Sequence, residues 1–354
     1  MLETIIRETE SAMKKYDVTI GIPIYNSVGC IQTSLMSALA QSYPSIEFLL
    51  VDDGCDDGTA DVVSYIIAEH SRRDDIHIIS HQKNLGVSAS RNQIIKEAKG
   101  EYLYFMDSDD TIEENTIELL IQNARQYDAE MVFGSYEKVD MSGHRVVYQY
   151  PSLQFLGDDE LASFAYRKYA GIQASACNYI VKTELLRSHH LRFIDTSYWE
   201  DFVFTFDLVT VVSRAVLLPN ITYHYICRCN SLSHYQERIG ISKDEVMQSV
   251  KANRHLVKTS DMLCDKVYFP NRCYVVAMTN FYVACAILKR RNAITPFFSN
   301  QEIKSIMCHP ASWGQICSFR QARLKNMFIY MIGKLPSSLC LATIWLMGRV
   351  KKLI

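Results

Sequence analysis

The stretch Tyr102-Leu103-Tyr104-Phe105-Met106-Asp107-Ser108-Asp109-Asp110 decides how the rest of the sequence is interpreted. It begins as an apolar, aromatic run that is typical of a buried β-strand, and it ends in three carboxylates within four positions. Carboxylates this close repel one another unless a cation lies between them, and oxygen ligands at a strand end suit Mg²⁺ or Mn²⁺. Because such cations commonly accompany a substrate diphosphate, the stretch predicts an enzyme that binds a nucleotide.

Strand-like and helix-like segments alternate around this stretch. The strand-like segments are short, apolar and rich in β-branched residues, and they are expected at residues 18–24, 46–51, 76–79 and 101–106. Segments with helical spacing separate them, at residues 31–42, 60–69 and 87–99. Strands that alternate with helices of this length pair in parallel through right-handed crossovers. The expected fold class is therefore α/β, with a mostly parallel, Rossmann-like sheet flanked by helices.

The pattern changes in the second part of the chain. Short strands are expected at residues 131–134 and 144–148, and the sequence after residue 242 is mostly helical. We therefore expect a first domain at residues 1–239 and a helical C-terminal subdomain at residues 240–354.

The most apolar part of that subdomain is the run from Met327 to Met347. Lys334 and Pro336 interrupt it, so it does not reach the roughly 20 apolar residues that a spanning helix needs. Two interpretations follow. The run forms a pair of amphipathic helices packed on the body of the protein, or an interfacial helix that lies on an anionic membrane surface.

Charge and cysteine usage limit the classes of partner and compartment. A formal net charge of −2 lacks the basic excess of most nucleic-acid binders, so we expect no nucleic-acid partner. The 11 cysteines are scattered and the sequence starts without a basic and apolar leader, which favours reduced thiols in a cytoplasm. A zinc site at Cys227 and Cys229 would need further Cys or His ligands at suitable spacing.

Polar residues gather where the predicted strands end. Pro23-Ile24-Tyr25-Asn26 closes the first strand, Asp52-Asp53 follows the second, and Asp107 to Asp110 end the fourth. The carboxyl ends of parallel strands meet at one edge of a sheet, where ligands bind in open α/β folds. We therefore expect these three clusters to converge on one site.

The second cluster continues into a turn, Val51 to Thr59, that its glycines allow. A carboxylate at Asp53 can accept the imide N–H of a uracil or the hydroxyls of a ribose. For Asp56 and Asp57, a turn or helix N-cap role is the simpler interpretation.

A fourth segment, Asn84 to Asn92, reads as a loop that runs into a helix. Gly86 allows a tight turn, Ser88 can cap the helix, and Arg91 follows in the first turn. The guanidinium of Arg91 can pair with a base edge, with a phosphate or with the strand-end carboxylates. A purely structural pair with an aspartate, which would hold the loop, is the alternative.

Taken in order, these four segments resemble family 2 of the glycosyltransferases. The resemblance covers roughly residues 15 to 235 and rests on Pro23 to Asn26, Val51 to Gly54, Asn84 to Asn92 and Asp107 to Asp110. It implies a GT-A fold, an inverting reaction, a nucleotide-diphosphate-sugar donor that is commonly UDP-linked, and a divalent cation, Mn²⁺ or Mg²⁺.

The resemblance also implies roles for residues at the donor. By position, Pro23 and Tyr25 would line the nucleobase pocket, while Asp53 and Arg91 would contact the uracil. The residues expected at the nucleotide-sugar site are Pro23, Tyr25, Asn26, Asp52, Asp53, Arg91, Asp107 and Ser108.

The same resemblance assigns the carboxylates of the fourth strand to the cation. Asp109 would be the main metal ligand, and Asp110 would be an alternate ligand. Asp107 would face the ribose or a metal-bound water, so the residues expected at the metal are Asp109, Asp107 and Asp110.

An inverting transfer needs a base that takes the proton of the acceptor hydroxyl. The family carries an Asp in a Glu-Asp pair before an apolar helix, and here that Asp is Asp201. Glu200 and Trp199 would lie near the acceptor or support the loop. Without the resemblance, this pair would be interpreted as a helix N-terminus with favourable charge.

Two further segments resemble the family less closely. Tyr179 stands where a Lys is usual in the family. His224 or Arg228 could bind the pyrophosphate or cap the site on closure, and a packed or surface role is the alternative for each.

The sequence thus predicts a metal-dependent, inverting glycosyltransferase that adds one sugar from a UDP-sugar to a glycan or lipid-linked glycan, in the biosynthesis of a surface polysaccharide. We expect it in the cytoplasm, or peripherally at the inner face of the cell membrane. The alternative is a non-catalytic nucleotide-sugar-binding or scaffolding module. A sugar-phosphate nucleotidylyltransferase would need Arg or Lys in the loop after the first strand, and residues 23–30 contain neither.

Overall fold

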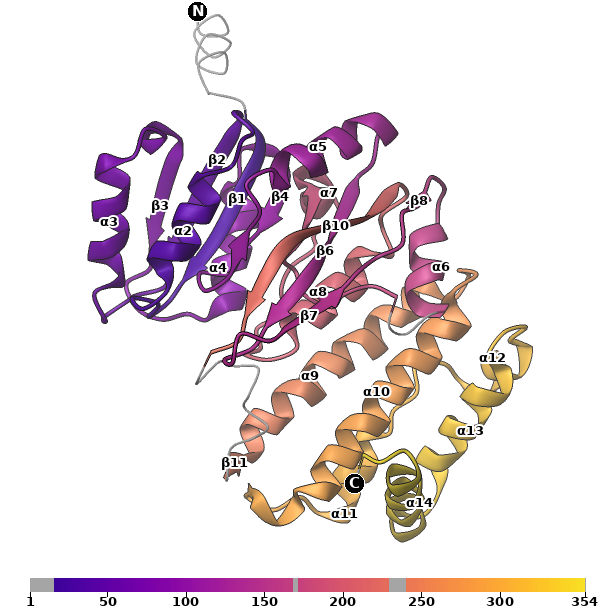
Figure 1. The fold of residues 1–354 in the computed structure, drawn as a ribbon. Coiled ribbons are helices and arrows are strands. Elements are labelled where there is room, and N and C mark those ends of the chain that lie inside the picture. Colours follow the sequence, from indigo (N-terminus) through magenta and orange to yellow (C-terminus); the bar gives the residue numbers. More distant parts are fainter. Residues whose placement is uncertain (1–15, 168–170, 229–239, 354) are drawn as a thin grey trace, which may run out of the picture. The chain divides into compact units, whose positions relative to one another are not determined.

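The computed structural model describes residues 16–167, 171–228 and 240–353 (Figure 1). The chain divides into two compact units, each built from several segments. Unit 1 comprises Met1–Gln154, Cys177–His190 and Ala215–Ile226. Unit 2 comprises Phe155–Ala176, Leu191–Arg214 and Cys227–Ile354.

This division differs from the predicted domains 1–239 and 240–354. Two segments that precede residue 239, at 155–176 and 191–214, belong to unit 2 together with the C-terminal helices. The domain boundary stays a prediction, because a compact unit is not thereby a part that folds alone.

Unit 1 is built on one sheet, in which ten strands pair within the described part of the chain. They are β1 (Tyr16–Ile24), β2 (Ile46–Asp52), β3 (Ile76–Ser80), β4 (Gly100–Phe105), β5 (Thr111–Ile112), β6 (Met131–Val139), β7 (Arg145–Tyr148), β8 (Leu153–Phe155), β9 (Tyr179–Lys182) and β10 (Ala215–Ile226). The order is β3-β2-β1-β4-β9-β6-β10-β5, with β7 beside β6 and β8 beside β10 (Figure 1).

The strands of the first part of the chain pair as predicted. β1 runs parallel to β2 and to β4, and β2 runs parallel to β3. β9 is antiparallel to both of its neighbours, β4 and β6, whereas β10 is parallel to β6. The mostly parallel α/β sheet is therefore confirmed.

The strands β1 and β4 lie at the centre of the parallel part of the sheet, and burial and one close backbone contact hold them together. β1 is buried from Val18 to Ile24, as a strand covered on both faces should be. Gly100 begins β4 where a Cβ atom would lie 2.3 Å from the backbone nitrogen of Thr19. Any larger residue at this position would push β4 away from β1.

Helices connect and cover these strands. They are α2 (Ile31–Leu39), α3 (Thr59–Glu69), α4 (Val87–Glu97), α5 (Thr116–Tyr127) and α7 (Thr183–Ser188). α2 packs against α3, and α4 packs against β1, β2 and α7. The predicted cap of α4 was wrong: Gly86 is the N-cap residue, at a φ of 91°, and Ser88 lies inside the helix.

Unit 2 is mostly helical, as predicted for the chain after residue 242. Its helices are α6 (Glu160–Arg167), α8 (Glu200–Leu208), α9 (Lys243–Ser260), α10 (Phe269–Lys289), α11 (Asn300–Ile306), α12 (Trp313–Ser318), α13 (Arg323–Lys334) and α14 (Ser337–Val350). The short strands β11 (Ile241–Ser242) and β12 (Ile294–Thr295) pair in parallel. α10 is the central helix, because α6, α9, α11, α13 and α14 all pack against it.

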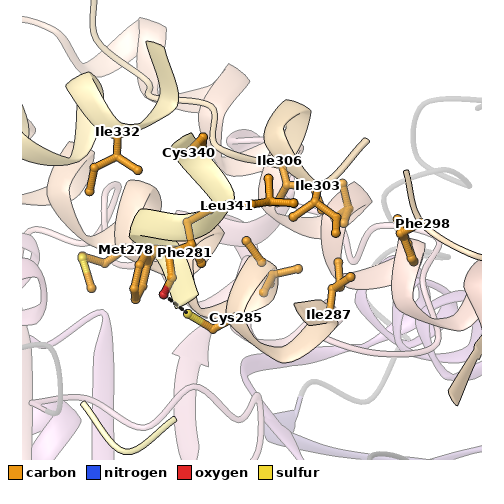
Figure 2. Packing of buried hydrophobic residues seen from close by; sticks show 14 of the residues in the cluster. Met278, Phe281, Cys285, Ile287, Phe298, Ile303, Ile306, Ile332, Cys340 and Leu341 are labelled. Atoms are coloured by element: carbon orange, nitrogen blue, oxygen red, sulfur yellow. Dashed lines mark hydrogen bonds between the residues drawn. The ribbon is translucent and has the colours of Figure 1, made fainter. Parts of the chain in front are cut away.

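The core of unit 2 forms around α10, as Figure 2 shows. Phe281 and Cys285 of α10 are fully buried, together with Ile303 of α11 and Ile344 of α14. Burying an aliphatic or aromatic side chain of this size contributes about 1.5–3 kcal/mol to folding. Ile332 of α13 belongs to the same cluster. The helices α11, α13 and α14 therefore share one apolar core, which fixes their positions around α10.

The apolar run at residues 327–347 forms a pair of helices, α13 and α14, that are separated at Leu335 and Pro336. Proline has no N–H with which to continue the ladder of α13, so the chain turns there. Both helices pack on α10, as one of the two interpretations expected. Within the ranges that the structure describes, no helix is long and apolar enough to cross a membrane.

Candidate functional site

Three carboxylates cluster directly after β4. One oxygen each of Asp107, Asp109 and Asp110 lies within 4.8 Å of the others. Asp107 and Asp109 are partly buried and Asp110 is buried. The predicted metal ligands therefore do lie together at the carboxyl end of the strand.

Asp110 is fixed by two bonds from β10. Its Oδ2 accepts a hydrogen bond of 2.6 Å from the Tyr223 hydroxyl, and its Oδ1 accepts one of 2.8 Å from the amide of Ile226. Burial and the nearby charge of Asp107 raise the pKa of Asp110 from 3.8 to about 7, although these two bonds act in the opposite direction. The cluster thus disfavours a further negative charge in the absence of a cation.

Asp107 is held from α4. Arg91 donates a hydrogen bond of 2.8 Å from Nη2 to Oδ1 of Asp107, and the Arg91 side chain is only 3% exposed. This is the structural Arg–Asp pair that the sequence left open as an alternative. The predicted contact of Arg91 with uracil stays a prediction, and little of the guanidinium surface is accessible for it.

Asp53, after β2, organises the loop before α4. Its Oδ1 contacts Nδ1 of His81 at 2.7 Å and accepts a bond of 2.9 Å from the amide of Leu85, and its Oδ2 accepts one of 2.8 Å from the amide of Gly86. Asp53 is 3% exposed. A carboxylate offers about four acceptor positions, and three are used here, so the predicted uracil contact of Asp53 stays a prediction that could use only the fourth.

The loop after β1 is tied to the loop after β2. Asn26, at a φ of 43°, donates from Nδ2 to Oδ1 of Asp56 at 2.8 Å and accepts from the amide of Asp56 at 3.1 Å. Oδ1 of Asp52 accepts from the amide of Cys55 at 3.0 Å. Asn26 and Asp52 thus have structural partners, and their predicted donor contacts stay predictions.

Two residues at this edge differ in accessibility. Pro23 is buried inside β1, whereas Tyr25 is 47% exposed. An exposed aromatic ring beside the strand ends is free to stack on a planar base. Of the two residues predicted to line the nucleobase pocket, Tyr25 therefore offers the accessible surface.

His224 on β10 has both ring nitrogens occupied. Nδ1 lies 2.8 Å from Glu137 and Nε2 lies 2.9 Å from Glu113. This arrangement leaves no ring nitrogen for the pyrophosphate contact predicted for His224, and the packed role offered as the alternative fits the geometry.

Ser108 lies in unit 1 beside the cluster, is partly buried, and its carbonyl accepts from Sγ of Cys30 at 3.5 Å, so its predicted donor contact stays a prediction. The predicted residues near the acceptor and the diphosphate belong to unit 2. Trp199 is the N-cap residue of α8 at a φ of 69°. Glu200 and Asp201 lie in the first turn, where negative charge interacts favourably with the helix dipole. Arg228 is the last residue before 229–239, which lie outside the described residues. The roles of Asp201 as base, and of Trp199, Glu200 and Arg228 near the substrates, stay predictions.

Sequence reasoning missed the residues that hold the carboxylates in place. Tyr223 bonds to Asp110 across 113 positions, and His81 contacts Asp53 across 28. The sequence carries a weak signal for Tyr223, because a tyrosine on a buried strand usually finds a partner for its hydroxyl. It does not say which partner.

The carboxylate cluster fits a hard divalent cation. Carboxylate oxygens are the ligands that Mg²⁺ and Mn²⁺ prefer, and three of them converge here. Burial, and in addition the charge of Asp107, raise the pKa of Asp110, and a bound cation would offset both. Asp107 and Asp109 are partly exposed, whereas Asp110 is buried and accepts two hydrogen bonds from β10.

Comparisons with known proteins agree with this geometry. Residues 19–181 match the family model described as glycosyl transferase family 2. Glycosyltransferase GlyG of Streptococcus pneumoniae is 25% identical over 236 residues, which are 65% of this chain and 77% of that protein. The cholesterol galactosyltransferase of Borreliella burgdorferi is 26% identical over 233 residues, which are 63% of this chain and 64% of that protein.

A solved structure agrees with the fold. The crystal structure of S. aureus TarS in complex with UDP-GlcNAc matches 90% of this chain and 90% of that chain, with a TM-score of 0.56 and 18% sequence identity. The predicted GT-A fold with additional C-terminal helices is confirmed. Sheet order, acidic strand end and family match agree, and the predicted resemblance to glycosyltransferase family 2 is confirmed over residues 19–181.

Proposed function

We propose that the protein transfers a single sugar, with inversion, from a UDP-sugar to a glycan or lipid-linked glycan acceptor, and that Mn²⁺ or Mg²⁺ is required. The observation that carries this proposal is the convergence of Asp107, Asp109 and Asp110 at the carboxyl end of β4. The complexes of S. aureus TarS with UDP-GlcNAc and with UDP support the choice of a UDP-linked donor. We further propose a role in surface polysaccharide biosynthesis, in the cytoplasm or at the inner face of the cell membrane.

Different residues of unit 1 would bind different parts of the donor. Asp109 and Asp107 would hold the cation, and Asp110 would complete or support the ligand set from its fixed position. A bound divalent cation would neutralise the charge that develops on the departing diphosphate. Tyr25 would stack on the uracil, and the remaining acceptor position on Asp53 would take the imide N–H.

Asp201 would act on the acceptor. A base accepts the proton of the hydroxyl as that oxygen attacks the anomeric carbon, and such a group contributes about 10²–10⁴-fold to the rate. The helix dipole at the start of α8 favours an ionised Asp201, which is the form that a base needs. Trp199 packs edge-to-face on Phe202 and would steady this turn.

The decisive experiment measures UDP release from a panel of UDP-sugars with mixed glycan acceptors, with Mn²⁺ and with excess EDTA. We expect turnover with one donor and loss of that turnover in EDTA. Asp201→Asn should lower kcat by about 10²–10⁴-fold while UDP affinity stays within a few-fold. Asp244→Asn is the matched control, because it removes a charge from the first turn of another helix, α9, outside the predicted site residues, and it should retain most of the turnover.

The same experiment separates the rival function. A chain that binds UDP with Mn²⁺ but releases no UDP from any donor would be a nucleotide-sugar-binding or scaffolding module. Near-normal turnover in Asp201→Asn would instead leave the enzyme intact and remove Asp201 from the role of base.

A further inference from the structure

A cavity of about 440 Å³ lies within unit 2, outside the donor site. Its walls come from α11, α13 and α14 and from the segment between α11 and α12, and they include Lys304, His309, Tyr330, Lys334 and Ser337. Its volume falls in the range of small-molecule sites. The apolar core around α10 holds all three helices, so the cavity has fixed walls.

The cavity carries positive charge that the described residues do not neutralise. Among the described residues, neither Lys304 nor Lys334 forms an ion pair with a carboxylate. Lys334 lies over the ring of Tyr330, with its Nζ 5.0 Å from the ring centroid. Two ammonium groups at one cavity attract an anion, because unit charges at close range interact strongly in partly buried surroundings.

His309 supplies shape and not charge to this cavity. Nε2 lies 3.0 Å from Oδ1 of Asn326, and Nδ1 accepts a hydrogen bond of 3.0 Å from the amide of Ala311. Burial is the main reason that the pKa of His309 lies below its ordinary value. The ring is therefore neutral near pH 7, and the lysines are the charged groups of the walls.

The helices that form the cavity also expose apolar side chains. The exposed apolar residues of α13 are Leu324, Phe328 and Met331, and those of α14 are Leu339, Trp345, Leu346 and Val350. On α13, these residues recur at spacings of four and three, so they share one side of the helix. Lys334 follows Met331 by three positions and therefore lies beside this apolar side.

The sequence around these helices has an unusual charge balance. From Trp313 to the last residue there are seven Lys or Arg residues and no Asp or Glu, although the whole chain has a net charge of −2. A basic helical surface with exposed apolar side chains is complementary to a bilayer that contains anionic lipids. Basic charge alone would suit either a lipid surface or an acidic protein. The exposed side chains of Phe328, Trp345 and Leu346 favour the lipid surface, because an acidic protein would not need them in solvent.

We propose that this cavity binds the phosphate of an anionic phospholipid while the exposed apolar sides of α13 and α14 enter the membrane interface. The inference deepens the membrane contact proposed above, on which it rests, and it names the chemical group that is recognised. Lys304 and Lys334 would contact the phosphate oxygens. The uncapped first turn of α14, which starts at Ser337, would add backbone N–H donors.

The test uses the full chain and vesicles of phosphatidylcholine, with and without phosphatidylglycerol, in a sedimentation assay. The double variant Lys304→Gln/Lys334→Gln should bind the anionic vesicles about thirtyfold more weakly than the wild-type chain. Lys351→Gln/Lys352→Gln removes the same charge outside the cavity and should show a clearly smaller loss. Equal losses in the two double variants, or no loss in the first, would overturn the proposal.

Two further arms identify the ligand. On vesicles whose negative charge comes from oleate, which has no phosphate, the two double variants should lose binding equally. Excess inorganic phosphate at constant ionic strength should leave most wild-type chains on the anionic vesicles, because the apolar side chains also contribute. Complete displacement would identify a free phosphate as the ligand and would overturn the assignment to a membrane.

Donor chemistry is a separate readout. UDP release without vesicles should be the same in Lys304→Gln/Lys334→Gln and in the wild-type chain, because neither lysine belongs to the donor site. A wild-type chain that binds anionic vesicles but releases no UDP would contradict the proposed enzyme and leave the phosphate cavity supported.

Discussion

Each unit has an aspartate with little exposed surface, Asp207 in unit 2 and Asp110 in unit 1, and the two aspartates have opposite surroundings. In unit 2, Asp207 contacts Arg272 at 2.8 Å and His255 at 2.8 Å. Burial alone would raise the pKa of Asp207, but these partners outweigh it and hold the pKa below its ordinary value. In unit 1, burial and the like charge of Asp107 raise the pKa of Asp110 to about 7.

The opposite pKa shifts of Asp207 and Asp110 distinguish a cluster that stabilises the fold from a cluster that can bind a ligand. The network around Asp207 is closed, because Arg272 is fully buried and also donates to Tyr166 and to Ser260. The cluster at Asp107, Asp109 and Asp110 concentrates like charges beside solvent, which is costly unless a cation binds there. Substitutions in the first cluster should affect stability, and substitutions in the second should affect ligand binding.

The largest expected effect is on the stability of unit 2. Arg272→Met leaves the buried carboxylate of Asp207 without its guanidinium, and removing one partner of such a pair costs about 3–5 kcal/mol. Urea denaturation should report this loss in the free energy of unfolding. Adding Asp207→Asn to Arg272→Met removes the stranded charge and should restore part of the stability. A single variant as stable as the wild-type chain would contradict the assignment of this network to structure.

The converse substitution in unit 1 should affect cation binding with little effect on stability. Asp109→Ala removes a carboxylate of the cluster, and we expect Mn²⁺ affinity to fall by more than about a hundredfold, since even indirect supports of a metal site are worth about 10–100-fold. The free energy of unfolding without Mn²⁺ should change by less than about 1 kcal/mol, because removing one of three crowded carboxylates also relieves repulsion. Calorimetry with Mn²⁺ and thermal melting provide the two readouts.

Asp56→Asn is the control for this variant, because Asp56 also lies at the carboxyl edge of the sheet but outside the cluster. It should bind Mn²⁺ like the wild-type chain. Equal losses of Mn²⁺ affinity in both variants would mean that the edge attracts cations by its general charge, and the contrast between the units would then disappear.

The structure explains which parts of this contrast the sequence could predict. Local periodicity identified the parallel strands and the helices between them, and the rule for carboxyl ends brought Asp53 and Asp107 to one edge. The pairing of Tyr223 with Asp110 depends on the register of β10 against β6, which includes two irregularities, and no local pattern sets that register.

The division into units escaped sequence reasoning for a related reason. α6 and α8 lie between strands of the sheet in sequence, yet α6 packs against α10 and α8 packs against α9. Their amphipathic pattern shows that each helix has a buried face but does not identify what covers it. The buried network of Asp207, Arg272 and His255 joins positions up to 65 residues apart and left no motif.

A pH titration of Mn²⁺ binding gives the next smaller effect. The pKa of Asp110 is about 7 in the folded chain, so Asp110 is protonated below pH 7. A cation that binds there must displace this proton. Mn²⁺ affinity should therefore rise by up to about tenfold per pH unit until pH 7 and then level off. Asp110→Asn keeps a group of the same shape and should remove most of this slope. A slope that persists in Asp110→Asn would assign the titration to another group.

The same shift acts on stability with the opposite sign. Because the folded state raises the pKa of Asp110 from 3.8 to about 7, its contribution to stability is fully present below pH 3.8 and is lost as the pH rises through 7. Saturating Mn²⁺ should restore that loss at pH 8. Thermal melting at pH 6 and pH 8, with and without Mn²⁺, would measure both changes.

The smallest predicted effect concerns Tyr223, whose hydroxyl donates to Asp110 and lies 3.3 Å from the amide nitrogen of Asp107. Tyr223→Phe removes a bond that opposes the rise in the pKa of Asp110, so the pKa should rise further and Mn²⁺ affinity at pH 7 should fall by about tenfold. The buried partners left behind should lower the free energy of unfolding by about 1–3 kcal/mol. Both readouts should change together in Tyr223→Phe, because the side chain belongs to the core of the sheet and its hydroxyl to the cation site. If Tyr223→Phe lowered the free energy of unfolding but left Mn²⁺ affinity unchanged, the hydroxyl would stabilise the sheet without affecting the carboxylates that bind the cation. Structural and cation-binding residues would then be fully distinct.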